Sequence, residues 1–365
     1  MTVADLEVAP APRRPGPSAR LAGVARRLMV AGLLAMIAGG LLGQGVRDRS
    51  VPWALLMDLP LHMIGMAAIW LDLVCRGRAW RWPRLPFALA AVGLVAIPVG
   101  ILPMVGRGVV DRTGAGAGPA PASPARAGRA TSVLQWNVIW GGGRRRNPER
   151  WAKIRREIAD RRADVVVLSE APPDDWLDEV VADLGPTGNR VQVENEPGVR
   201  YWYKLAVASA RPVRPIGRPA VRNGTALAVE VAGAGGAADG DGGPLRLLVV
   251  DGLSHPWVDR TPFLVDVAAA CRAAEAAGTP FDLVLGDFNS MARSVGFDAL
   301  AAAGYDPAPG ASWGWRGTYP ALVPAYDIDH AWARRDRPGG VGWRPFTNLA
   351  GDHRGQVVTL GPQGG

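Results

Sequence analysis

The chain has 365 residues, of which 48% are hydrophobic, and its formal net charge is +8. The hydrophobic content is enough for a sizeable core and excludes a disordered chain. The only cysteines, Cys75 and Cys271, belong to no Cys/His cluster, which excludes a disulfide scaffold and a structural zinc site. The charge is unevenly distributed, because residues 1–130 carry a net +9 and residues 131–365 carry −1. The basic character therefore lies outside the C-terminal part, which weakens a nucleic-acid interpretation of the net charge.

The first part of the chain contains apolar stretches of membrane-spanning length. Leu28 to Val46 and Leu85 to Gly106 carry no charge, and each is long enough as a helix to cross a hydrocarbon core of about 30 Å. Val51 to Cys75 is also mostly apolar. It contains three ionisable residues, Asp58, His62 and Asp72. We expect three transmembrane helices within residues 28–106, and two as the alternative, because intramembrane carboxylates are costly. A signal peptide is disfavoured because further apolar stretches follow the first one.

Arginines predict the orientation of these helices. Residues 1–27, which we assign as a cytoplasmic segment, contain five Arg, and residues 76–84 contain four, whereas residues 47–50 contain two. Positive residues favour the cytoplasmic side, so three spans would place everything after Gly106 outside the cell membrane. If Val51 to Cys75 does not span, the C-terminal domain would be cytoplasmic instead. Residues 107–130 are rich in Gly, Ala and Pro and are predicted to be a linker.

Residues 131–361 alternate between strand-like and helix-like segments. Asn147-Pro148-Glu149 is typical of a helix start, and Thr261-Pro262 begins another helix. Predicted strands lie at Thr131–Val138, Ala163–Glu170, Val191–Glu194, Tyr201–Ser209, Thr225–Val231, Leu245–Leu253, Phe281–Phe288, Ile328–Ala333, Val341–Phe346 and Gln356–Leu360. Predicted helices follow at 147–162, 171–185, Thr261–Ala277 and Val295–Ala303. Strands outnumber helices and often follow one another directly, which predicts a mixed-sheet α/β sandwich and not a Rossmann fold.

Polar residues follow several of the predicted strands. They are Asn137, Glu170, His255, Asp287 with Asn289, Asp329 with His330, and Asp352 with His353. Oxygen ligands of this kind select Mg²⁺, Mn²⁺ or Ca²⁺ over zinc. Each residue alone has an ordinary structural explanation, but their succession at strand ends predicts one shared metal and phosphate site.

The motifs QWNV, LSE, SHP, GDFNS, YDIDHAW and GDHR occur in this order. Residues 131–361 thereby resemble the endonuclease/exonuclease/phosphatase superfamily, which includes DNase I, sphingomyelinases and inositol-polyphosphate phosphatases. The resemblance implies a four-layered α/β sandwich (a DNase I-like fold), preceded here by a small transmembrane helical region. It also implies a divalent-metal-dependent phosphoric ester hydrolase that uses Mg²⁺ or Mn²⁺.

The resemblance further implies a role for each polar residue. Glu170 is the main metal-binding carboxylate, with Asn137 beside it and Asp352 as a further metal-proximal carboxylate. Asp287 orients or deprotonates the attacking water, and Asn289 contacts the phosphate. His353 is the catalytic histidine, oriented by Asp329, and His255 is a second histidine that contacts phosphate or acts as general acid. Which residue is the general base stays open.

Two positions depart from the superfamily pattern. Gly351 stands in place of the usual Ser before the Asp-His pair, and Gly355 stands in place of the usual Pro after it. The chemical residues themselves are present, so we expect an active enzyme with altered local loop geometry, and an inactive copy is the alternative. Trp313, Trp315 and Tyr319 either line a substrate groove or pack internally.

The combination of three spans with an outward-facing phosphoesterase domain resembles the teicoplanin-resistance membrane proteins of actinomycetes. That resemblance implies glycopeptide resistance and a substrate in the membrane, a phosphate ester or pyrophosphate of a cell-envelope lipid. A surface-exposed DNase-like endonuclease is one alternative, although the near-neutral domain makes nucleic acid the less favoured partner. A non-catalytic membrane sensor of a phosphorylated ligand is another. The sequence indicates no protein partner.

Overall fold

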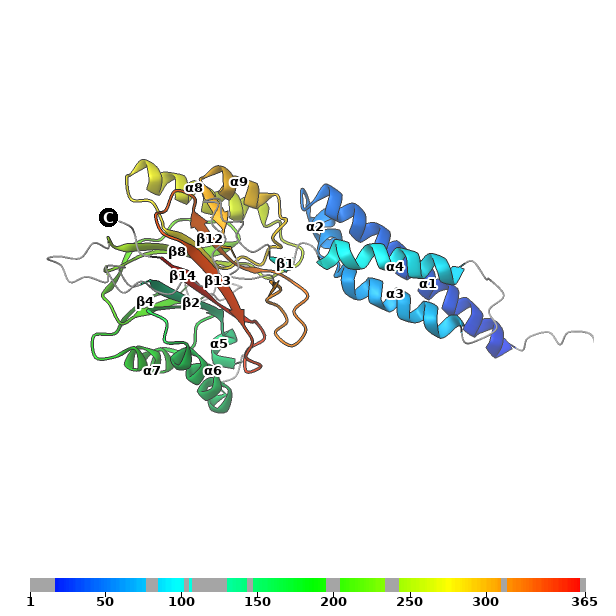
Figure 1. Ribbon diagram of the computed structural model, residues 1–365, viewed down its shortest axis with the longest axis horizontal. Helices are drawn as coiled ribbons and strands as arrows, with labels where there is room; N and C mark the ends of the chain where they lie inside the picture. Colours follow the sequence, from blue (N-terminus) through cyan, green and yellow to red (C-terminus); the bar gives the residue numbers. More distant parts are fainter. Residues whose placement is uncertain are drawn as a thin grey trace, which may run out of the picture.

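The computed structural model describes residues 17–76, 85–101, 105–106, 130–142, 147–194, 204–233, 243–309 and 314–361. Within these residues the C-terminal part is an α/β sandwich built on two six-stranded mixed sheets, and a group of helices lies at one end of it (Figure 1). The predicted fold class is therefore confirmed. The predicted linker 107–130 lies outside the described residues except for Ala130.

The first sheet has the strand order β13-β14-β2-β3-β5-β4. Its strands are β2 (Thr131–Asn137), β3 (Val165–Ser169), β4 (Asn189–Glu194), β5 (Lys204–Ser209), β13 (Val341–Phe346) and β14 (Gly355–Leu360). Only β2 and β3 run parallel to each other, and the other neighbours are antiparallel. Helix α6 (Pro148–Arg161) connects the parallel pair, as a parallel crossover requires.

The second sheet has the order β10-β12-β9-β8-β7-β6. Its strands are β6 (Val213–Gly217), β7 (Gly224–Val231), β8 (Leu245–Gly252), β9 (Leu283–Asp287), β10 (Tyr305–Pro307) and β12 (Asp329–Arg334). Here β8 and β9 form the parallel pair, with α8 (Thr261–Ala276) between them in the chain. The two sheets thus share a plan in which one central parallel pair carries its C-terminal ends to the same edge.

Three apolar layers hold the four structural layers together. Val133, Val249 and Leu285 belong to the cluster between the sheets. A second cluster, which includes the stacked rings of Trp151 and Trp176, packs α6 and α7 (Asp174–Leu184) against the first sheet. A third packs α8 and α9 (Gly296–Ala302) against the second sheet. Because both sheets are covered on both faces, their central strands are apolar throughout, as in β3, whose five residues are all buried.

Local signals in the sequence account for most element boundaries. Asn147 caps α6, because its Oδ1 accepts a hydrogen bond from Arg150 N at 3.1 Å. The strand β6 was not predicted. It contains Pro215 and lies at the sheet edge, where a missing backbone donor is tolerated. The short strands β10 and β11 (Gly314–Trp315) were also not predicted, because two or three residues carry no periodicity.

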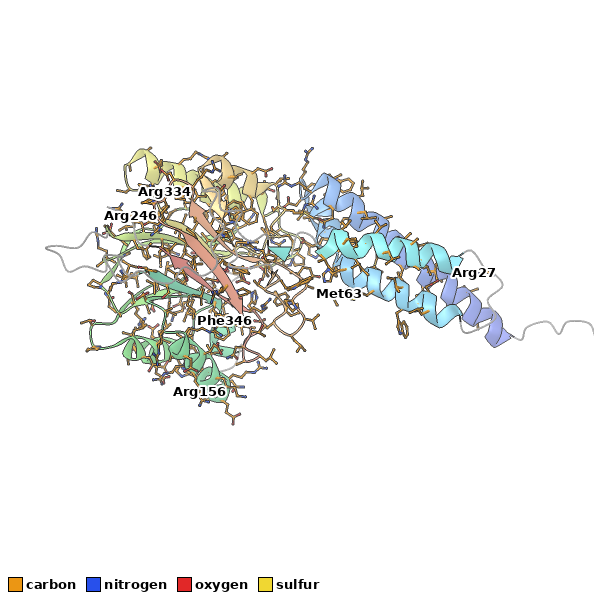
Figure 2. All side chains as sticks on the ribbon, viewed as in Figure 1. Arg27, Met63, Arg156, Arg246, Arg334 and Phe346 are labelled. Carbon is orange, nitrogen blue, oxygen red and sulfur yellow. The ribbon has the colours of Figure 1, made fainter. Side chains whose placement is uncertain are left out.

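The helical part consists of α1 (Pro17–Val46), α2 (Val51–Met57), α3 (Leu61–Arg76) and α4 (Leu85–Ile101). The helices α1, α3 and α4 lie side by side as an antiparallel bundle, with α2 at the end near the sandwich (Figure 1). Arg27 lies near the opposite end of the bundle and Met63 near the sandwich (Figure 2). A two-residue strand β1 (Val105–Gly106) after α4 pairs with β11 of the sandwich.

One helix among the described residues, Gly23–Val46, is long and apolar enough to cross a membrane. The predicted span Val51 to Cys75 is a bent pair of helices that turns by 54° at the break between Met57 and Leu61. The predicted span Leu85 to Gly106 ends earlier as a helix, at Ile101, and its last two residues are the strand β1. With 17 residues, α4 lies at the lower limit of the length that a helix needs to cross a hydrocarbon core. The sequence overestimated helix length here because apolarity alone does not locate the end of a helix.

Candidate functional site

The strand ends of both sheets bring polar side chains to one place. Asn137 ends β2 and Glu170 follows β3, so both lie at the C-terminal edge of the parallel pair of the first sheet. Asp287 ends β9 of the second sheet, and Asp329, at the start of the antiparallel β12, lies directly opposite it. His353 precedes β14 and is buried, as are Asn137, Asp287 and Asp329. Residues that are far apart in sequence are therefore collected where the two sheets meet.

His353 and Asp329 form a buried pair. The Nδ1 atom of His353 lies 2.8 Å from Asp329 Oδ2 and 3.8 Å from Asp287 Oδ2. Burial opposes a charge on the imidazole, but Asp329, Asp287 and Asp352 outweigh it and raise the pKa of His353 to about 10. The backbone carbonyl of His353 accepts a hydrogen bond from Trp136 Nε1 at 2.9 Å, which fixes the loop that carries the ring. The pair thus holds a protonated imidazole in one orientation. The second ring nitrogen, Nε2, takes no part in the pair.

Asp287 is the most constrained carboxylate of the site. Its Oδ2 accepts a hydrogen bond from Asn137 Nδ2 at 2.9 Å, and its Oδ1 accepts one from Asn289 N at 2.9 Å. Burial and the nearby charge of Asp329 raise its pKa to about 7, although His353 and the two hydrogen bonds oppose this. A carboxyl group with a pKa near neutrality can both lose and accept a proton under physiological conditions.

Asn137 connects the two sheets across the site. Its Nδ2 also donates to Glu170 Oε1 at 3.2 Å, and its Oδ1 accepts a hydrogen bond from Ile139 N. Glu170 adopts a left-handed backbone conformation with φ 44°, which is uncommon outside glycine and typical of functional positions. Asn137 therefore holds Glu170 and Asp287 toward each other although they belong to different sheets.

Asn289 and Asp352 lie on the two loops beside this cluster. Asn289, with φ 48°, donates from Nδ2 to Gly252 O at 2.8 Å, which holds the turn after Asp287. The backbone carbonyl of Asp352 accepts from Ala321 N at 2.6 Å, and its Oδ1 is buried without a hydrogen-bond partner. Seven of the predicted site residues are thus joined by hydrogen bonds or electrostatic coupling, namely Asn137, Glu170, Asp287, Asn289, Asp329, Asp352 and His353.

The two remaining histidines of the motifs occupy other positions. His255 lies in the loop after β8, and its Nδ1 accepts a hydrogen bond from Trp257 N at 3.4 Å. This contact is local, and its predicted role in phosphate binding stays a prediction. His330 packs behind the site, where its Nε2 lies 2.8 Å from Ser290 O and its ring contacts Phe288 and Phe297.

One acidic residue of the cluster was missed in the sequence. Asp251 lies near the end of β8 in parallel register with Asp287, and only 2% of its surface is exposed. Its Oδ2 has no hydrogen-bond partner, and burial, Asp287 and Glu170 raise its pKa well above the usual value. In the sequence, VVDG ends a buried strand with the carboxylate of Asp251, as LVLGD does with that of Asp287. Asp251 was missed because it belongs to none of the motifs.

Aromatic residues close one side of the site. The Tyr319 ring lies 4.9 Å from the ring of His353, and burial followed by Asp352, Asp287 and Glu170 raises the pKa of its hydroxyl. Trp315 packs against His62 of α3 with its ring 5.3 Å away, and its Nε1 donates to Pro324 O. Of the three aromatics predicted in this segment, Trp313 lies outside the described residues.

The donor set suits a hard divalent cation. Asp287, Asp329 and His353 each offer a ligand atom within 4.8 Å of the others, although His353 is an imidazolium when it pairs with Asp329. The carboxylates are therefore the better candidates for a cation, and Glu170 and Asp352 add two more. The two orphaned carboxylate oxygens, on Asp251 and Asp352, show that the cluster holds more negative charge than its own hydrogen bonds satisfy. A bound Mg²⁺ or Mn²⁺ would neutralise it.

Two glycines explain the departures from the superfamily motif. A Cβ atom on Gly355 would lie 2.1 Å from Cζ of Phe346, the residue opposite it on β13, so no side chain fits there. A Cβ atom on Gly351 would lie 3.2 Å from the Trp136 ring, which is tight. The large rings of Phe346 and Trp136 occupy the space that side chains at these two positions would take, while the catalytic loop between them keeps its polar residues.

The chain matches one protein family and is similar in structure to several solved proteins. The model of the endonuclease/exonuclease/phosphatase family matches residues 134–353. The human nocturnin catalytic domain is similar in structure, with 16% identity, a TM-score of 0.48, and coverage of 63% of this chain and 92% of that one.

A mannosyl-6-phosphatase of Bacteroides thetaiotaomicron has 12% identity and a TM-score of 0.47, covering 63% of this chain and 99% of that one. The endonuclease domain of a telomere-specific non-LTR retrotransposon has 17% identity and a TM-score of 0.45, covering 65% of this chain and all of that one. No curated protein matches the chain. Because the family model spans more than half of the sequence, the chain belongs to the endonuclease/exonuclease/phosphatase family.

Proposed function

We propose that this protein is a membrane-anchored, divalent-cation-dependent phosphoesterase that hydrolyses a phosphate ester or pyrophosphate of a cell-envelope lipid. The observation that carries the proposal is the buried His353–Asp329 pair beside Asp287, in a family that consists mostly of phosphoesterases and nucleases. A sensor that only binds a phosphorylated ligand would not need a buried imidazolium held by a carboxylate.

Each residue of the site has a separate role in the proposed reaction. His353, protonated and held by Asp329, offers a proton from Nε2 to a phosphate oxygen or to the leaving group. Asp287, with a pKa of about 7, accepts the proton of the attacking water. Asn289 is positioned to contact the phosphate from the turn after Asp287. A bound Mg²⁺ or Mn²⁺ supplies charge neutralisation of the phosphate, and Glu170, Asp352 and the Oδ1 atom of Asn137 are the groups proposed to hold it.

The membrane location rests on α1 and on the arginine pattern. The apolar helix Gly23–Val46 is of spanning length, and the end marked by Arg27 lies away from the sandwich (Figure 2). Arginines favour the cytoplasmic side, so the sandwich would lie outside the membrane, with the bent pair α2–α3 and α4 as two further spans. Reporter fusions after Val46, Arg76 and Leu360 test this arrangement. Cytoplasmic-type activity of the fusion after Leu360 would refute the extracytoplasmic location.

Two features support a lipid substrate, namely the membrane tether and the net charge of residues 131–361. A tethered site meets membrane-borne phosphates at a high effective concentration. Residues 131–361 lack the net positive charge that a nuclease uses to bind its substrate's backbone. The resemblance to teicoplanin-resistance membrane proteins adds an undecaprenyl-type carrier as the first lipid to test.

A substrate panel tests the proposal directly. The full-length protein, reconstituted in nanodiscs with Mg²⁺ or Mn²⁺, is compared with its His353→Ala and Glu170→Ala variants. The panel contains polyprenyl phosphate, polyprenyl pyrophosphate, a phospholipid and plasmid DNA. We expect release of phosphate or headgroup from a lipid, lost in both variants. Cleavage of DNA alone would replace the lipid substrate with the nuclease alternative, and inertness toward all four would overturn the enzyme assignment.

A further inference from the structure

The contact between the helical bundle and the sandwich falls on the segment that follows the catalytic residues of β9. Six residues separate Asp287 from Ser294, and this stretch carries Asn289 near its start. The end of this segment at Ser294 contacts the helical bundle as well as the sandwich. Residues Gln44, Arg47 and Asp48, at the end of α1, bind it through side-chain hydrogen bonds. We call these three residues the α1 latch.

Asp48 makes the most enclosed contact of the α1 latch. It is buried, its Oδ1 accepts from Val295 N at 2.6 Å, and its Oδ2 accepts from the hydroxyl of Ser294. These two residues directly precede α9, and its N-cap residue, Val295, makes no side-chain cap hydrogen bond. A residue of the bundle therefore caps a helix of the sandwich, a role that is normally filled by a neighbour in the chain.

Arg47 reinforces the same contact. Its guanidinium donates to Arg293 O at 2.6 Å, to Ser294 O at 2.7 Å and to both carboxylate oxygens of Asp298 at 2.8 and 3.0 Å. Arg47 itself has φ 63°, a left-handed conformation that is costly for a residue with a side chain. This strained turn ends α1 and is held by the contacts that the side chain makes.

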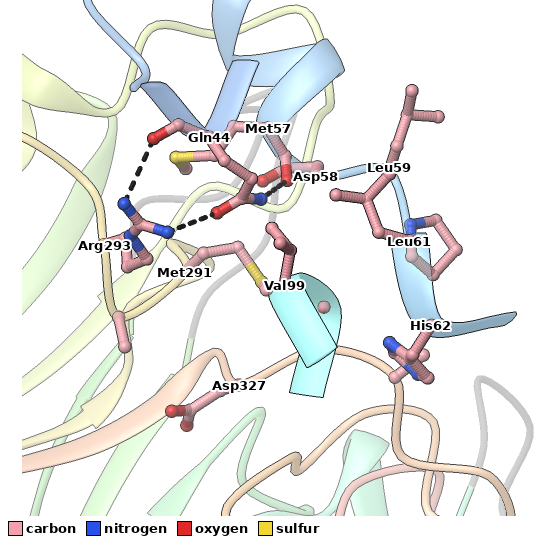
Figure 3. Close-up of a pocket in the computed structure, with 14 residues that line it drawn as sticks. Gln44, Met57, Asp58, Leu59, Leu61, His62, Val99, Met291, Arg293 and Asp327 are labelled. Atoms are coloured by element: carbon pink, nitrogen blue, oxygen red, sulfur yellow. Dashed lines mark hydrogen bonds between the residues drawn. The ribbon is translucent and has the colours of Figure 1, made fainter. Parts of the chain in front are cut away.

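Gln44 completes the α1 latch from one turn earlier. Figure 3 shows its side chain between Arg293 and the backbone of Met57. Arg293 donates to Gln44 Oε1 at 3.1 Å and to Gln44 O at 3.2 Å, while Gln44 Nε2 donates to Met57 O at 2.7 Å. The network thereby joins α1, α2 and the segment after Asn289 into one connected set of hydrogen bonds.

The opposite wall of the site is tied to the same end of the bundle. Trp315 stacks edge-on against His62, and β11 pairs with β1. Three residues further along, Thr318 Oγ1 accepts a hydrogen bond from Asp329 N at 3.1 Å, and Tyr319 lies against His353. Both loops that flank the catalytic centre are therefore anchored on the helices, and the bundle is a structural part of the site.

We propose that Asp48 and Arg47 are positioning residues of the phosphoesterase site, which hold the segment after Asp287 and keep the site near the membrane surface. The five steps along the chain from Asn289 to Ser294 span at most roughly 17 Å, so Asn289 lies within that distance of the residue that Asp48 contacts. A phosphate carried at the headgroup level is close to that depth, whereas a large soluble polyanion would have to approach past the bundle. This inference rests on the proposed function and specifies how the site selects a membrane-borne phosphoester.

The test compares four variants of the full-length protein in nanodiscs. Arg47→Gly removes the side chain and relieves the positive φ, and Asp48→Ala removes the cap. Asp48→Asn keeps an acceptor for Val295 N and a polar partner for Ser294. Arg49→Ala is the matched control, because Arg49 is an exposed arginine of the same loop. The readouts are kcat and KM for bis(p-nitrophenyl) phosphate and for the lipid hydrolysed in the substrate panel, with hydrogen exchange of residues 289–299.

We expect Asp48→Ala and Arg47→Gly to lower kcat about tenfold for the soluble diester, and kcat/KM further for the lipid. Hydrogen exchange of residues 289–299 should accelerate in both. Asp48→Asn should stay within about twofold of the wild type, and Arg49→Ala should be unchanged. Unchanged kcat in Asp48→Ala and Arg47→Gly would overturn the positioning role, as would equal losses in Asp48→Asn and Asp48→Ala. If the wild type hydrolyses no phosphoester, the proposed function fails, whatever the variants do. Hydrogen exchange of residues 289–299 then tests the α1 latch by itself. An unchanged exchange rate in Asp48→Ala would refute the α1 latch.

Discussion

Asp251 and Asp287 lie opposite each other on the parallel strands β8 and β9, and both carboxyl groups are buried. Burial raises the pKa of Asp251 well above its usual value, and the charge of Asp287 is the largest contribution after burial. Two buried carboxylates side by side are unfavourable in a protein without a cation, so the arrangement stores repulsion that a divalent cation would relieve.

Replacing Asp251 by Asn tests this repulsion. Because Asn has nearly the same shape and no charge, Asp251→Asn should stabilise the cation-free protein at pH 8 by about 1 kcal/mol, or roughly 2–4 °C in Tm. Divalent cations should then stabilise the variant less than the wild type. Thermal unfolding with EDTA and with Mn²⁺ measures both effects.

Asp164→Asn is the control for that experiment. Asp164 Oδ2 accepts hydrogen bonds from the backbone and the hydroxyl of Ser132, both at 2.8 Å, so its carboxylate is well partnered. This substitution should give no stabilisation. A lower Tm in Asp251→Asn than in the wild type under EDTA would contradict the stored repulsion.

The His353–Asp329 pair predicts a coupled loss of charge and activity. Asp329→Asn removes the carboxylate that holds the imidazolium, so the pKa of His353 should fall from about 10. Since the proton donor is then misoriented and less charged, kcat should fall by about 10² to 10⁴-fold. The chain has only four histidines, so His353 can be assigned in an NMR titration by its absence from His353→Gln. A wild-type kcat in Asp329→Asn would remove this pair from the mechanism.

The raised pKa of Asp287 predicts how cation binding depends on pH. A cation held beside Asp287 by Glu170 and Asp352 would lower the pKa of Asp287 through its charge, so affinity for Mn²⁺ should rise as pH increases up to about 7 and then level off. Titration calorimetry in two buffers of different ionisation enthalpy should detect proton release near pH 6. Asp287→Asn should abolish that release, and a pH-independent affinity in the wild type would contradict the assignment.

The same two groups predict a pH dependence of stability without cations. The folded pKa of Asp287 lies above its usual 3.8, so its contribution is fully present at low pH and is lost as pH rises to about 7. For His353 the contribution is present below 6.5 and is lost as pH rises through about 10. The Tm measured with EDTA should therefore fall between pH 5 and pH 10, and Asp287→Asn should flatten the lower part of this curve. A Tm that rises over this range would refute both signs.

The close packing of Gly355 gives a prediction about the core near the site. Gly355→Ala places a methyl group against the Phe346 ring and should destabilise the protein by about 1–3 kcal/mol. The double variant Gly355→Ala/Phe346→Leu should recover part of this loss, because the smaller side chain leaves room. Thermal unfolding of the wild type, of Gly355→Ala, of Phe346→Leu and of the double variant measures the coupling, and additive losses would show that the two positions do not compete for space.

The sequence predicted the sandwich and most of its central strands because buried strands are continuous apolar runs with turn residues between them. From strand ends and motif order it also predicted the placement of Asn137, Glu170, Asp287 and Asp329 at strand ends and of Asp352 before the last strand. It missed Asp251, because the importance of that carboxylate depends on the register between β8 and β9, which no local pattern specifies. It also missed the contact between α1 and α9. Arg47 and Asp48 were counted only as loop charges, and their partners lie about 250 positions further along the chain.

The pairing of β1 with β11 also determines how the two parts of the chain are joined. Val105 is matched with Trp315 and Gly106 with Gly314, so the backbone that follows α4 is hydrogen-bonded to the sandwich. The helical part is therefore attached through a backbone ladder as well as through the side chains of the α1 latch. A backbone ladder does not depend on which side chains occupy these positions, so substitutions in the α1 latch would leave this second attachment in place.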